Sequence, residues 1–575
     1  MLKLFRFLKP YTLSITAVLV FVFFQSISEL FLPTLMADIV DIGIVTGDTG
    51  YILRIGGIMI LVAVGGVFCT ILGNLLSSRT AMSFGKDLRG LVFAHVQAFS
   101  RHEFDQIGTA SLITRTTNDI TQVQMVLIMI LRMMVSAPLM FIGGIIMALS
   151  RDVQLSGTIV AIIPVIAAVI ALIAIKAIPL YKSMQVKLDK LNLVLRENLT
   201  GIRVIRAFNR IDQEKKRFNE ANLDLTDTAI KVNKILAIVM PALILSLNFT
   251  TIAVIWFGSA RIDSGHMQVG DLMAFLQYVM LIMFSLIMVS MMFVMIPRAS
   301  ASASRINQVL DAVPGIKDPL RVKTDSGSRG CVEYRDVTFS YPGAEKPAVS
   351  NISFSAGPGE VTAIIGGTGS GKSTLFNLML RFYDLDSGAI LLDGVDIRDM
   401  TQERLRAKIG YIPQIALLFT GTVAENIRFG KQGATDEEIR HAAAIAQATE
   451  FITGMPGGFD AFIAQGGANV SGGQKQRLAI ARALVRMPEI YIFDDSFSAL
   501  DFKTDAMVRA ALKKYTGEST IFIIAQRVNT VMAADRIIVL DGGRVAGIGA
   551  HKELLESCAV YREIVYSQLA KEEIA

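Results

Sequence analysis

Long apolar stretches dominate the first part of the chain, and polar segments separate them. The stretches long enough to cross a bilayer lie at residues 13–33, 52–76, 126–149, 155–178, 235–258 and 272–296. A membrane-spanning helix needs about 20 apolar residues, so the pattern predicts an all-α transmembrane domain with six spans. The residues before the first span carry Lys3, Arg6 and Lys9. They predict an amphipathic helix at the membrane surface rather than a cleaved leader.

The charges of the polar segments indicate the orientation of the spans. Lys and Arg are concentrated between the second and third spans and between the fourth and fifth, and the opposite connections are short and nearly free of them. Cytoplasmic loops carry this excess, so we expect both termini and both long segments in the cytoplasm. The second segment has leucines at a heptad-like spacing, at Leu188, Leu191, Leu195 and Leu199. We therefore expect the long segments to be helices that continue beyond the membrane.

The pattern changes after Pro297. Residues 298–305 continue the last helix, and residues 314–330 are rich in Pro, Gly, Ser and charge, which is typical of a linker. From Cys331 onward, short apolar runs alternate with helical stretches, which is typical of an α/β domain. The predicted strands are residues 332–339, 361–365, 409–412, 490–493, 520–524 and 536–540. The chain is thus predicted to comprise a transmembrane domain at 1–313, a linker at 314–330 and an α/β domain at 331–575.

The composition agrees with a membrane protein. Of the 575 residues, 52% are hydrophobic and only 18% are charged, and the net charge is +6. These values exclude a disordered chain, a collagen-like fibre and a nucleic-acid-binding tail. The three cysteines, Cys69, Cys331 and Cys558, are too scattered for a disulfide framework or a metal site, so we expect reduced thiols.

A glycine-rich segment follows the predicted strand 361–365 and precedes a predicted helix at 375–381. It matches the pattern G-x-x-x-x-G-K-[ST], in which main-chain N–H groups close around phosphates. Its residues are Gly366, Gly367, Thr368, Gly369, Ser370, Gly371, Lys372, Ser373 and Thr374. Lys372 supplies a positive charge to the β- and γ-phosphates, and the Ser373 hydroxyl suits Mg²⁺. The segment predicts that the chain binds ATP with Mg²⁺.

Two further elements of the α/β domain concern the same nucleotide chemistry. Asp494 ends a buried apolar strand, where a carboxylate holds Mg²⁺ through water. A second helix start with small residues, able to bind an anion, consists of Ser471, Gly472, Gly473 and Gln474. One chain needs only one such helix start for its own phosphate loop. The second is explained if it covers the γ-phosphate of an ATP molecule held by another subunit.

This order of elements resembles one half of an ABC exporter of the type IV, multidrug-exporter architecture, and the resemblance covers essentially the whole chain. It implies that Tyr341 stacks on adenine and that Asp501 belongs to the D-loop. It implies that Gln414 links Mg²⁺ to the membrane domain, so the implied metal ligands are Ser373, Gln414 and Asp494. The segments near residues 104–113 and 210–219 occupy the places of the two coupling helices. The second of these would dock on the partner's nucleotide-binding domain.

The chain departs from the family pattern at its catalytic positions. Asp495 stands where the family has the Glu that polarises the attacking water, and Gln526 stands where it has a His. The shorter Asp side chain withdraws the carboxylate by roughly 1 Å, which can lower a rate about 10²-fold. Gln can donate a hydrogen bond but carries no positive charge. Residues 464–467 also lack the usual Glu and Arg, and Val470 replaces a Leu. We expect this chain to bind ATP and to hydrolyse it slowly.

These departures predict a partner and a function. The resemblance implies a head-to-tail pair, in which each ATP molecule lies between the phosphate loop (P-loop, residues 366–374) of one chain and the signature segment (residues 471–474) of the other. We expect a heterodimer in which a second, non-identical ABC exporter half keeps the Glu and the His. The chain is then the degenerate half of a bacterial multidrug exporter in the plasma membrane. It would be in contact with lipid and would move small hydrophobic or amphipathic compounds by alternating access. We expect no nucleic-acid partner.

Several alternatives for the cargo and the mode of action stay open. The same architecture also exports lipids or peptides, and a regulatory or channel-like ABC protein would use ATP binding to open a gate. Methionines are frequent in the last span, where they suit either a cavity for varied apolar molecules or plain helix packing. Glu29 and Arg132 lie within predicted spans. Glu29 could attract a cationic compound, lie near the outer surface or pair with a neighbouring helix, and Arg132 could lie at the cytoplasmic end of its span.

Overall fold

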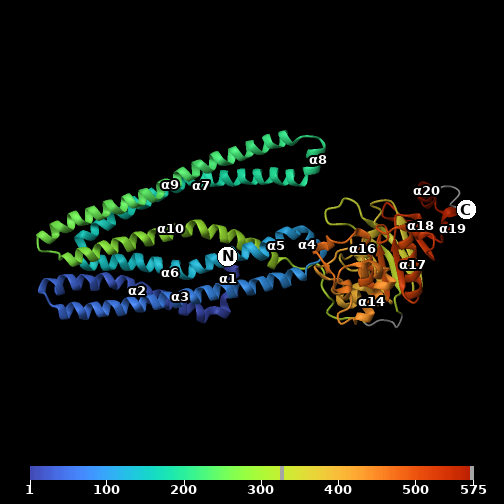
Figure 1. Ribbon diagram of the computed structural model, residues 1–575, viewed down its shortest axis with the longest axis horizontal. Helices are drawn as coiled ribbons and strands as arrows, with labels where there is room; N and C mark the ends of the chain where they lie inside the picture. The colour runs from blue at the N-terminus through green and yellow to red at the C-terminus, as the bar shows by residue number, and fades with distance from the viewer. Residues whose placement is uncertain (324–328, 570–575) are drawn as a thin grey trace. The chain divides into compact units, whose positions relative to one another are not determined.

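The computed structural model describes residues 1–323 and 329–569. It divides into two compact units. The first comprises residues 1–95 and 110–311, and the second comprises residues 96–109 and 312–575 (Figure 1). The chain therefore leaves the first unit, contributes a short segment to the second, and returns before it enters the second for good.

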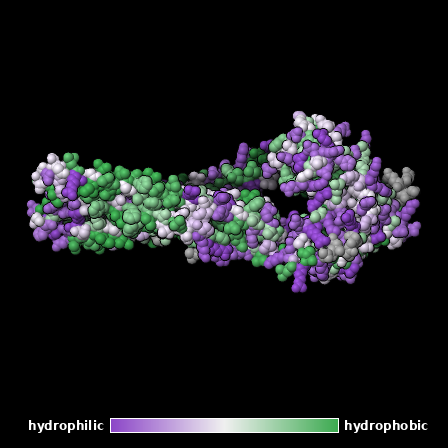
Figure 2. All heavy atoms as spheres, turned by 90° about the horizontal axis from the view of Figure 1, so that it is seen from below, coloured by the Kyte–Doolittle hydropathy of each residue, from purple (hydrophilic) through white to green (hydrophobic). Residues whose placement is uncertain are grey.

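Long helices make up the first unit. Within the described residues, six helical segments are long and apolar enough to cross a membrane, as the sequence predicts. Their main helices are α2 (Thr12–Asp38), α3 (Thr49–Gln97), α6 (Ile120–Arg151), α7 (Val153–Thr200), α9 (Ile211–Asp263) and α10 (Val269–Asp311). Short elements join them, namely α1 (Leu2–Phe5), η1 (Arg6–Tyr11), η2 (Ile39–Ile44), α5 (Thr109–Thr114), η3 (Arg115–Asp119) and α8 (Ile202–Ala207). Figure 2 shows apolar residues gathered over the long helices, as a lipid-facing surface requires.

Helix α10 packs along both α6 and α2, whereas α7 packs mainly along α9 (Figure 1). Phe275 and Tyr278 of α10 are completely buried in this core. The Tyr278 hydroxyl shares a hydrogen bond of 2.7 Å with Thr34 Oγ1 and donates to Leu30 O at 3.2 Å. The polar tip of this buried ring is thus satisfied by α2, which fixes the two helices in register.

The first turn of α10 is capped by another element. Asp41 lies in the π-helical turn η2, and its carboxylate accepts hydrogen bonds from Gly270 N–H at 2.6 Å and Asp271 N–H at 3.0 Å. Arg151 Nη1 donates to Asp271 Oδ1 at 2.8 Å beside it. The first N–H groups of a helix have no partner within the helix. The carboxylate of Asp41 supplies that partner and ties α10 to the end of α2.

A second π-helical turn holds the other end of α10. Asp119 in η3 is almost completely buried, and it accepts a hydrogen bond from Arg305 Nε at 2.8 Å. Arg115 Nη1 donates to the main-chain oxygen of Arg305 at 3.2 Å. Helix α10 is therefore anchored at each end by an aspartate from a widened helical turn.

The second unit contains a mostly parallel sheet with strand order β12-β11-β3-β10-β9-β6 and an antiparallel sheet with order β2-β1-β4-β5. The predicted strands appear as β1 (Val332–Phe339), β3 (Val361–Gly366), β6 (Ile409–Ile412), β9 (Ile490–Asp494), β10 (Thr520–Ile524) and β11 (Arg536–Asp541). The sequence did not predict β2 (Val349–Ala356), β4 (Ser387–Leu392), β5 (Val395–Asp396), β7 (Gly421–Thr422), β8 (Phe462–Ile463) and β12 (Arg544–Gly549). The eight-residue β2 was missed because it alternates buried and exposed residues and so lacks a continuous apolar run.

Helices surround these sheets. They are α11 (Lys372–Met379), α12 (Gln402–Ala407), α13 (Val423–Arg428), α14 (Asp436–Ile445), α15 (Thr449–Gly454), α16 (Gly472–Leu484), α17 (Phe502–Tyr515), α18 (Val528–Val531), α19 (His551–Ser557) and α20 (Ala559–Gln568). The apolar core on one side of the parallel sheet contains α16, α17 and α20, and the core on the other side contains α11 and the antiparallel sheet. Both faces of the parallel sheet are therefore covered.

The two predicted coupling segments differ from the structure. The first is split, because Gly108 has a φ of +80° and separates α4 (Arg101–Ile107) from α5. Helix α4 belongs to the second unit, where the Tyr383 hydroxyl donates to Asp105 Oδ2 at 3.5 Å. The second segment, residues 210–219, is not a short separate helix. Residues 211–219 form the start of α9, and the short helix α8 lies before them, since Asn209 turns the chain with a φ of +52°.

The close approach at the start of α10 yields a testable prediction. A Cβ atom on Gly270 would lie 2.5 Å from the main-chain oxygen of Ala37 and 2.6 Å from Asp41 Oδ2. We expect Gly270→Ala to lower the stability of the transmembrane unit by roughly 1–3 kcal/mol, measured as a lower thermal unfolding temperature of the detergent-purified protein. Gly57→Ala is the control, because nothing lies within 4 Å of its added Cβ. An unchanged unfolding temperature for Gly270→Ala would show that this cap does not hold α10.

Candidate functional site

The glycine-rich segment forms a tight loop between β3 and α11. Gly369 and Gly371 have φ values of +80° and +94°, a backbone region that side chains disfavour. A Cβ atom on Gly366 would lie 2.2 Å from the main-chain oxygen of Leu540, and one on Gly371 would lie 2.7 Å from that of Ala348. Gly367, Thr368 and Gly369 are exposed at the tip of the loop. The left-handed Gly371 lets α11 begin at Lys372, three residues earlier than the sequence predicted.

Lys372 lies folded over this loop. Its ammonium group donates to the main-chain oxygens of Gly366 at 2.8 Å and Gly367 at 2.7 Å, and to Ser370 Oγ at 3.4 Å. Burial lowers the pKa of Lys372, and the nearby Asp495 and Asp494 carboxylates oppose this shift. All the hydrogen-bond acceptors around the ammonium group are uncharged. A cation held by neutral oxygens beside a loop of main-chain N–H groups fits the phosphates of a nucleotide.

Asp494 is buried at the end of β9. The Ser373 hydroxyl donates to its Oδ1 at 3.1 Å, and the Tyr411 hydroxyl donates to its Oδ2 at 3.3 Å. Burial raises the pKa of Asp494, and these two hydrogen bonds oppose the shift. The Ser373 hydroxyl and the Asp494 carboxylate together are hard oxygen ligands of the kind that Mg²⁺ takes alongside nucleotide phosphates. The residues present therefore fit this ion.

Asp495 lies at the meeting point of three segments. Its main chain is left-handed, with a φ of +47°, and its N–H donates to the main-chain oxygen of Ile524 at 3.0 Å. Its Oδ2 atom accepts two side-chain amide hydrogen bonds, from Gln414 Nε2 at 3.2 Å and from Gln526 Nε2 at 3.1 Å. Burial raises the pKa of Asp495, and the hydrogen bond from Gln414 lowers it in part. The structure thus brings together both residues at the catalytic positions, Asp495 and Gln526, and joins them to Gln414.

Tyr341 lies beside the start of α11. Its hydroxyl shares a hydrogen bond of 3.1 Å with Thr374 Oγ1. Its ring meets the ring of Tyr383 edge to face, with centroids 5.3 Å apart, and that of Phe339 at 5.0 Å. An aromatic side chain next to the phosphate loop is in a position suited to contact a nucleotide base.

The signature segment forms the start of α16. Ser471 Oγ accepts from Gln474 N–H at 3.3 Å, and Gln474 Oε1 accepts from Ser471 N–H at 2.9 Å, which makes a capping box. Ser471 and Gly472 are exposed. A Cβ atom on Gly473 would lie 3.2 Å from the main-chain oxygen of Ala499. Asp501 caps the next helix, α17, by accepting from Thr504 N–H at 2.9 Å.

Two residues at the site were missed by the sequence analysis. Tyr411 holds Asp494, and Gln476 of α16 donates to the main-chain oxygen of Pro413 at 3.1 Å, next to Gln414. The second contact ties the signature helix to the segment that carries Gln414. Tyr411 could have been suspected from its place in the strand before Gln414. Gln476 gives no such signal, because a glutamine within a helix is usually exposed.

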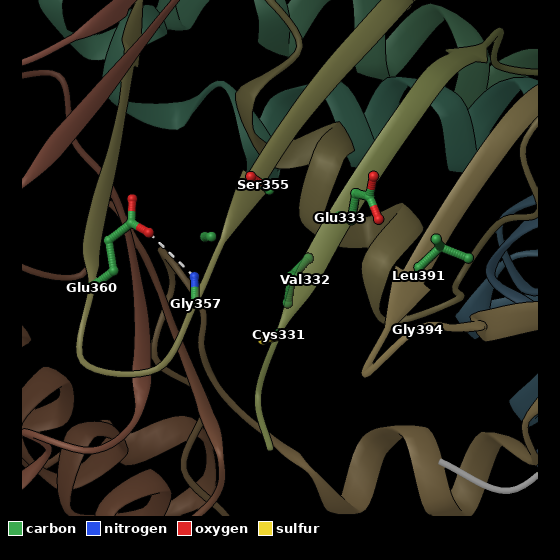
Figure 3. A pocket seen from close by; sticks show the side chains of 9 residues that line it. Cys331, Val332, Glu333, Ser355, Gly357, Glu360, Leu391 and Gly394 are labelled. Carbon is green, nitrogen blue, oxygen red and sulfur yellow. Dashed lines mark hydrogen bonds between the residues drawn. The ribbon is translucent and has the colours of Figure 1, made fainter. Parts of the chain in front are cut away.

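A separate hollow of about 250 Å³ lies where β1 begins and β2 ends (Figure 3). Its acidic side chains already have partners. Arg335 pairs with Glu333, and Gly357 N–H donates to Glu360 Oε2 at 3.2 Å. None of the residues that line it belongs to the phosphate loop. We therefore place the candidate site at the opposite end of β3, where the carboxyl ends of the parallel strands meet.

The fold and the site together define a class, a nucleotide-binding domain joined to a set of six spans in one chain. Comparison with known families identifies the family to which this class of protein belongs. Residues 15–296 match the ABC transporter transmembrane region, and residues 349–498 match the ABC transporter family. The chain belongs to the ABC transporter family, and it is an exporter chain with permease and ATP-binding domains. It is a multi-pass membrane protein that binds ATP, and an ATPase coupled to transport.

Similar proteins extend over the whole chain. An uncharacterized ABC transporter ATP-binding protein of Mycobacterium tuberculosis is 42% identical over 98% of this chain and 97% of that protein. A probable multidrug resistance ABC transporter ATP-binding/permease protein of Bacillus subtilis is 32% identical, with 98% and 96% covered. An ATP-dependent lipid A-core flippase of Aromatoleum aromaticum is 35% identical, with 87% and 83% covered. The structure of a bacterial Atm1-family ABC exporter with ATP bound matches with a TM-score of 0.81 and 26% identity, over 97% and 98% of the two chains.

The surroundings of Lys372 predict its part in nucleotide binding. We expect Lys372→Ala to weaken ATP binding by roughly ten- to a hundredfold, since a hydrogen bond to a charged group contributes about 1.5–3 kcal/mol. A fluorescent ATP analogue titrated into the purified protein measures the effect. Lys552→Ala, an exposed lysine of α19, is the control and should leave the affinity unchanged. Equal affinities for the wild type and Lys372→Ala would remove Lys372 from the phosphate site.

Proposed function

We propose that this chain is the degenerate half of a heterodimeric bacterial ABC exporter. Its own P-loop site holds ATP with Mg²⁺ and turns over slowly, and its signature segment completes a competent site on a non-identical partner. The observation that carries the proposal is the environment of Asp495, whose Oδ2 atom accepts hydrogen bonds from two glutamine side chains. The predicted division of the chain, with a transmembrane domain at 1–313 and a nucleotide-binding domain at 331–575, is part of the proposal.

Slow hydrolysis follows from the chemistry of the attacking water. The group that polarises this water accepts its proton, and Asp495 places its carboxylate roughly 1 Å farther back than a Glu would. Two amide donors stabilise the charged carboxylate and engage an oxygen that would accept the proton. Gln526 is neutral, so it adds no positive charge beside the γ-phosphate.

Binding of ATP is retained in this proposal. Tyr341, Lys372, Ser373, Gln414 and Asp494 lie around the phosphate loop in positions that suit a nucleotide. The amide nitrogen of Gln414 donates to Asp495. The amide oxygen of Gln414 is therefore the atom that would bind a metal ion. Bound Mg²⁺ would supply positive charge to the β- and γ-phosphate oxygens. The five residues orient the nucleotide, and the weakness lies at the step that moves the proton.

A partner subunit explains two exposed features. Ser471 and Gly472 present the start of α16 to solvent, and a helix start of this kind attracts an anion. Helix α8 and the turn after it expose the apolar side chains of Ile202, Val204 and Phe208. An exposed apolar turn between two long helices suits docking on a second nucleotide-binding domain. We infer that both features are covered in the dimer.

We place the protein in the bacterial plasma membrane, with both termini in the cytoplasm, and propose small hydrophobic or amphipathic compounds as its cargo. The similarity to a probable multidrug resistance transporter supports this cargo. Glu29 is hydrogen-bonded within its own helix, by Gln25 Nε2 at 3.0 Å, so a cationic compound would have to compete for it. Lipid is the second candidate cargo, and the similarity to a lipid A-core flippase favours it.

The degenerate-half proposal makes a direct prediction on ATPase activity. We expect the chain alone to be nearly silent, and to support strong activity once it is co-purified with its partner. The double variant Asp495→Glu, Gln526→His should raise ATP turnover of the chain alone by roughly ten- to a hundredfold. The longer Glu moves the carboxylate toward the attacking water, and the His restores a side chain that can carry positive charge. Steady-state phosphate release measures both effects.

The control for this experiment is Asp541→Glu, which adds a methylene to an exposed carboxylate at the end of β11. It should leave phosphate release unchanged. Brisk hydrolysis by the wild-type chain alone would contradict the proposal, because Asp495 would then suffice as the base. The chain would in that case be a homodimeric exporter.

The two candidate cargoes are distinguished by reconstitution of the complex into vesicles. We expect ATP-dependent accumulation of a lipophilic dye, and no ATP-dependent movement of a fluorescent phospholipid between leaflets. The Lys372→Ala variant is the matched control, since it removes the ATP contact and leaves the transmembrane unit unchanged. Phospholipid movement without dye transport would replace the multidrug proposal by the lipid one.

A further inference from the structure

Gln568 ends the last helix of the described chain, α20, and lies against the segment that carries Gln526. Its Oε1 atom accepts a hydrogen bond from Val528 N–H at 2.9 Å, and its Nε2 donates to the main-chain oxygen of Gln526 at 2.8 Å. The oxygen and the nitrogen of one side-chain amide therefore both form hydrogen bonds with the main chain of residues 526–528. Figure 1 labels α18 and α20 near the C-terminus.

The segment held in this way bears the groups that face Asp495. Ala525 N–H still belongs to the sheet, since it donates to the main-chain oxygen of Ile364 at 3.2 Å. Thr530 N–H bonds within the next turn, to Arg527 O at 3.1 Å. Between these two points, Gln526 extends its side chain to Asp495, and Arg527 places its guanidinium over the ring of Phe502, 5.6 Å from the centroid.

Helix α20 is a firm support for this contact. Tyr561 and Val565 are completely buried in the core beside β11, and the Tyr561 hydroxyl shares a hydrogen bond of 2.7 Å with His551 Nδ1. The body of the helix is thus fixed, while Gln568 itself is exposed at its end. A residue that merely ended α20 in solvent would have no need to use both its donor and its acceptor on another segment.

We propose that Gln568 is a positioning residue of the ATP site. It fixes the main chain of residues 526–528 so that the Gln526 side chain points to Asp495, and α20 thereby influences the reactivity of this site. The inference rests on the proposed roles of Asp495 and Gln526. Loss of the two hydrogen bonds lets Gln526 leave its position. Oδ2 of Asp495 then loses one of its two amide donors and is more available to accept the proton of the attacking water. Hydrolysis at this site is therefore faster, and ATP binding, which depends on the phosphate loop, is maintained.

The test compares two substitutions in the full-length chain. Gln568→Met keeps the length of the side chain and removes both hydrogen bonds, and Gln568→Glu keeps only the acceptor for Val528 N–H. We expect Gln568→Met to speed single-turnover ATP hydrolysis by the chain roughly five- to tenfold, with ATP affinity unchanged within about twofold. Gln568→Glu should give a smaller increase. Glu563→Gln, at an exposed position of the same helix, is the control.

A cycle with Gln526→Ala separates positioning from general destabilisation. If Gln568 acts through Gln526, Gln568→Met causes no further change in the hydrolysis rate in the Gln526→Ala background. Additive changes in the rate would overturn the proposal. Fast hydrolysis by the wild-type chain would contradict only the degenerate-half proposal. The cycle would still measure whether the effect of Gln568→Met on the hydrolysis rate requires Gln526.

Hydrogen exchange gives a readout that does not depend on activity. We expect the Val528 amide to exchange roughly tenfold faster in Gln568→Met, and to keep most of its protection in Gln568→Glu. The Ala525 amide is the internal reference and should not change, because its bond lies in the sheet. Unchanged protection of Val528 in Gln568→Met would overturn the proposal.

Discussion

The parallel order β3-β10-β9-β6 is the constraint on which the site depends. Neighbouring parallel strands end on the same edge of a sheet, so the residues that follow them must meet there. The phosphate loop follows β3, Gln526 follows β10, Asp495 follows β9 and Gln414 follows β6. The contacts at Asp494 and Asp495 are the result of this order. A change in strand order would separate these side chains even if each were retained.

In the transmembrane unit, the comparable constraint is that helix ends need partners for their main-chain groups. Asp41 supplies the partner at the start of α10, and Asp119 holds Arg305 toward its end. Both aspartates lie in π-helical turns, where the extra residue changes the direction in which a side chain points. Helix α10 is therefore held by directional polar contacts at its ends and by apolar packing against α2 and α6 between them.

Much of the fold could be predicted from the sequence because the central strands and the spans are continuous apolar runs. The strand β2 could not, since it alternates, and neither could the early start of α11, which depends on the left-handed Gly371. Phosphate-loop residues are recognisable because their spacing is dictated by the nucleotide. Gln476 and Gln568 are not, because nothing in a helical glutamine indicates which distant main-chain group it will bind. Such contacts depend on the tertiary arrangement alone.

The place of α4 has a consequence for how the protein folds during synthesis. Residues 96–109 belong to the same compact unit as residues 312–575, so that unit is discontinuous along the chain. A ribosome that adds about 5–20 residues per second needs on the order of ten seconds or more to reach the second part. Throughout that time α4 has emerged without the surface it packs on, and the nucleotide-binding unit can complete its fold only after most of the chain has been translated.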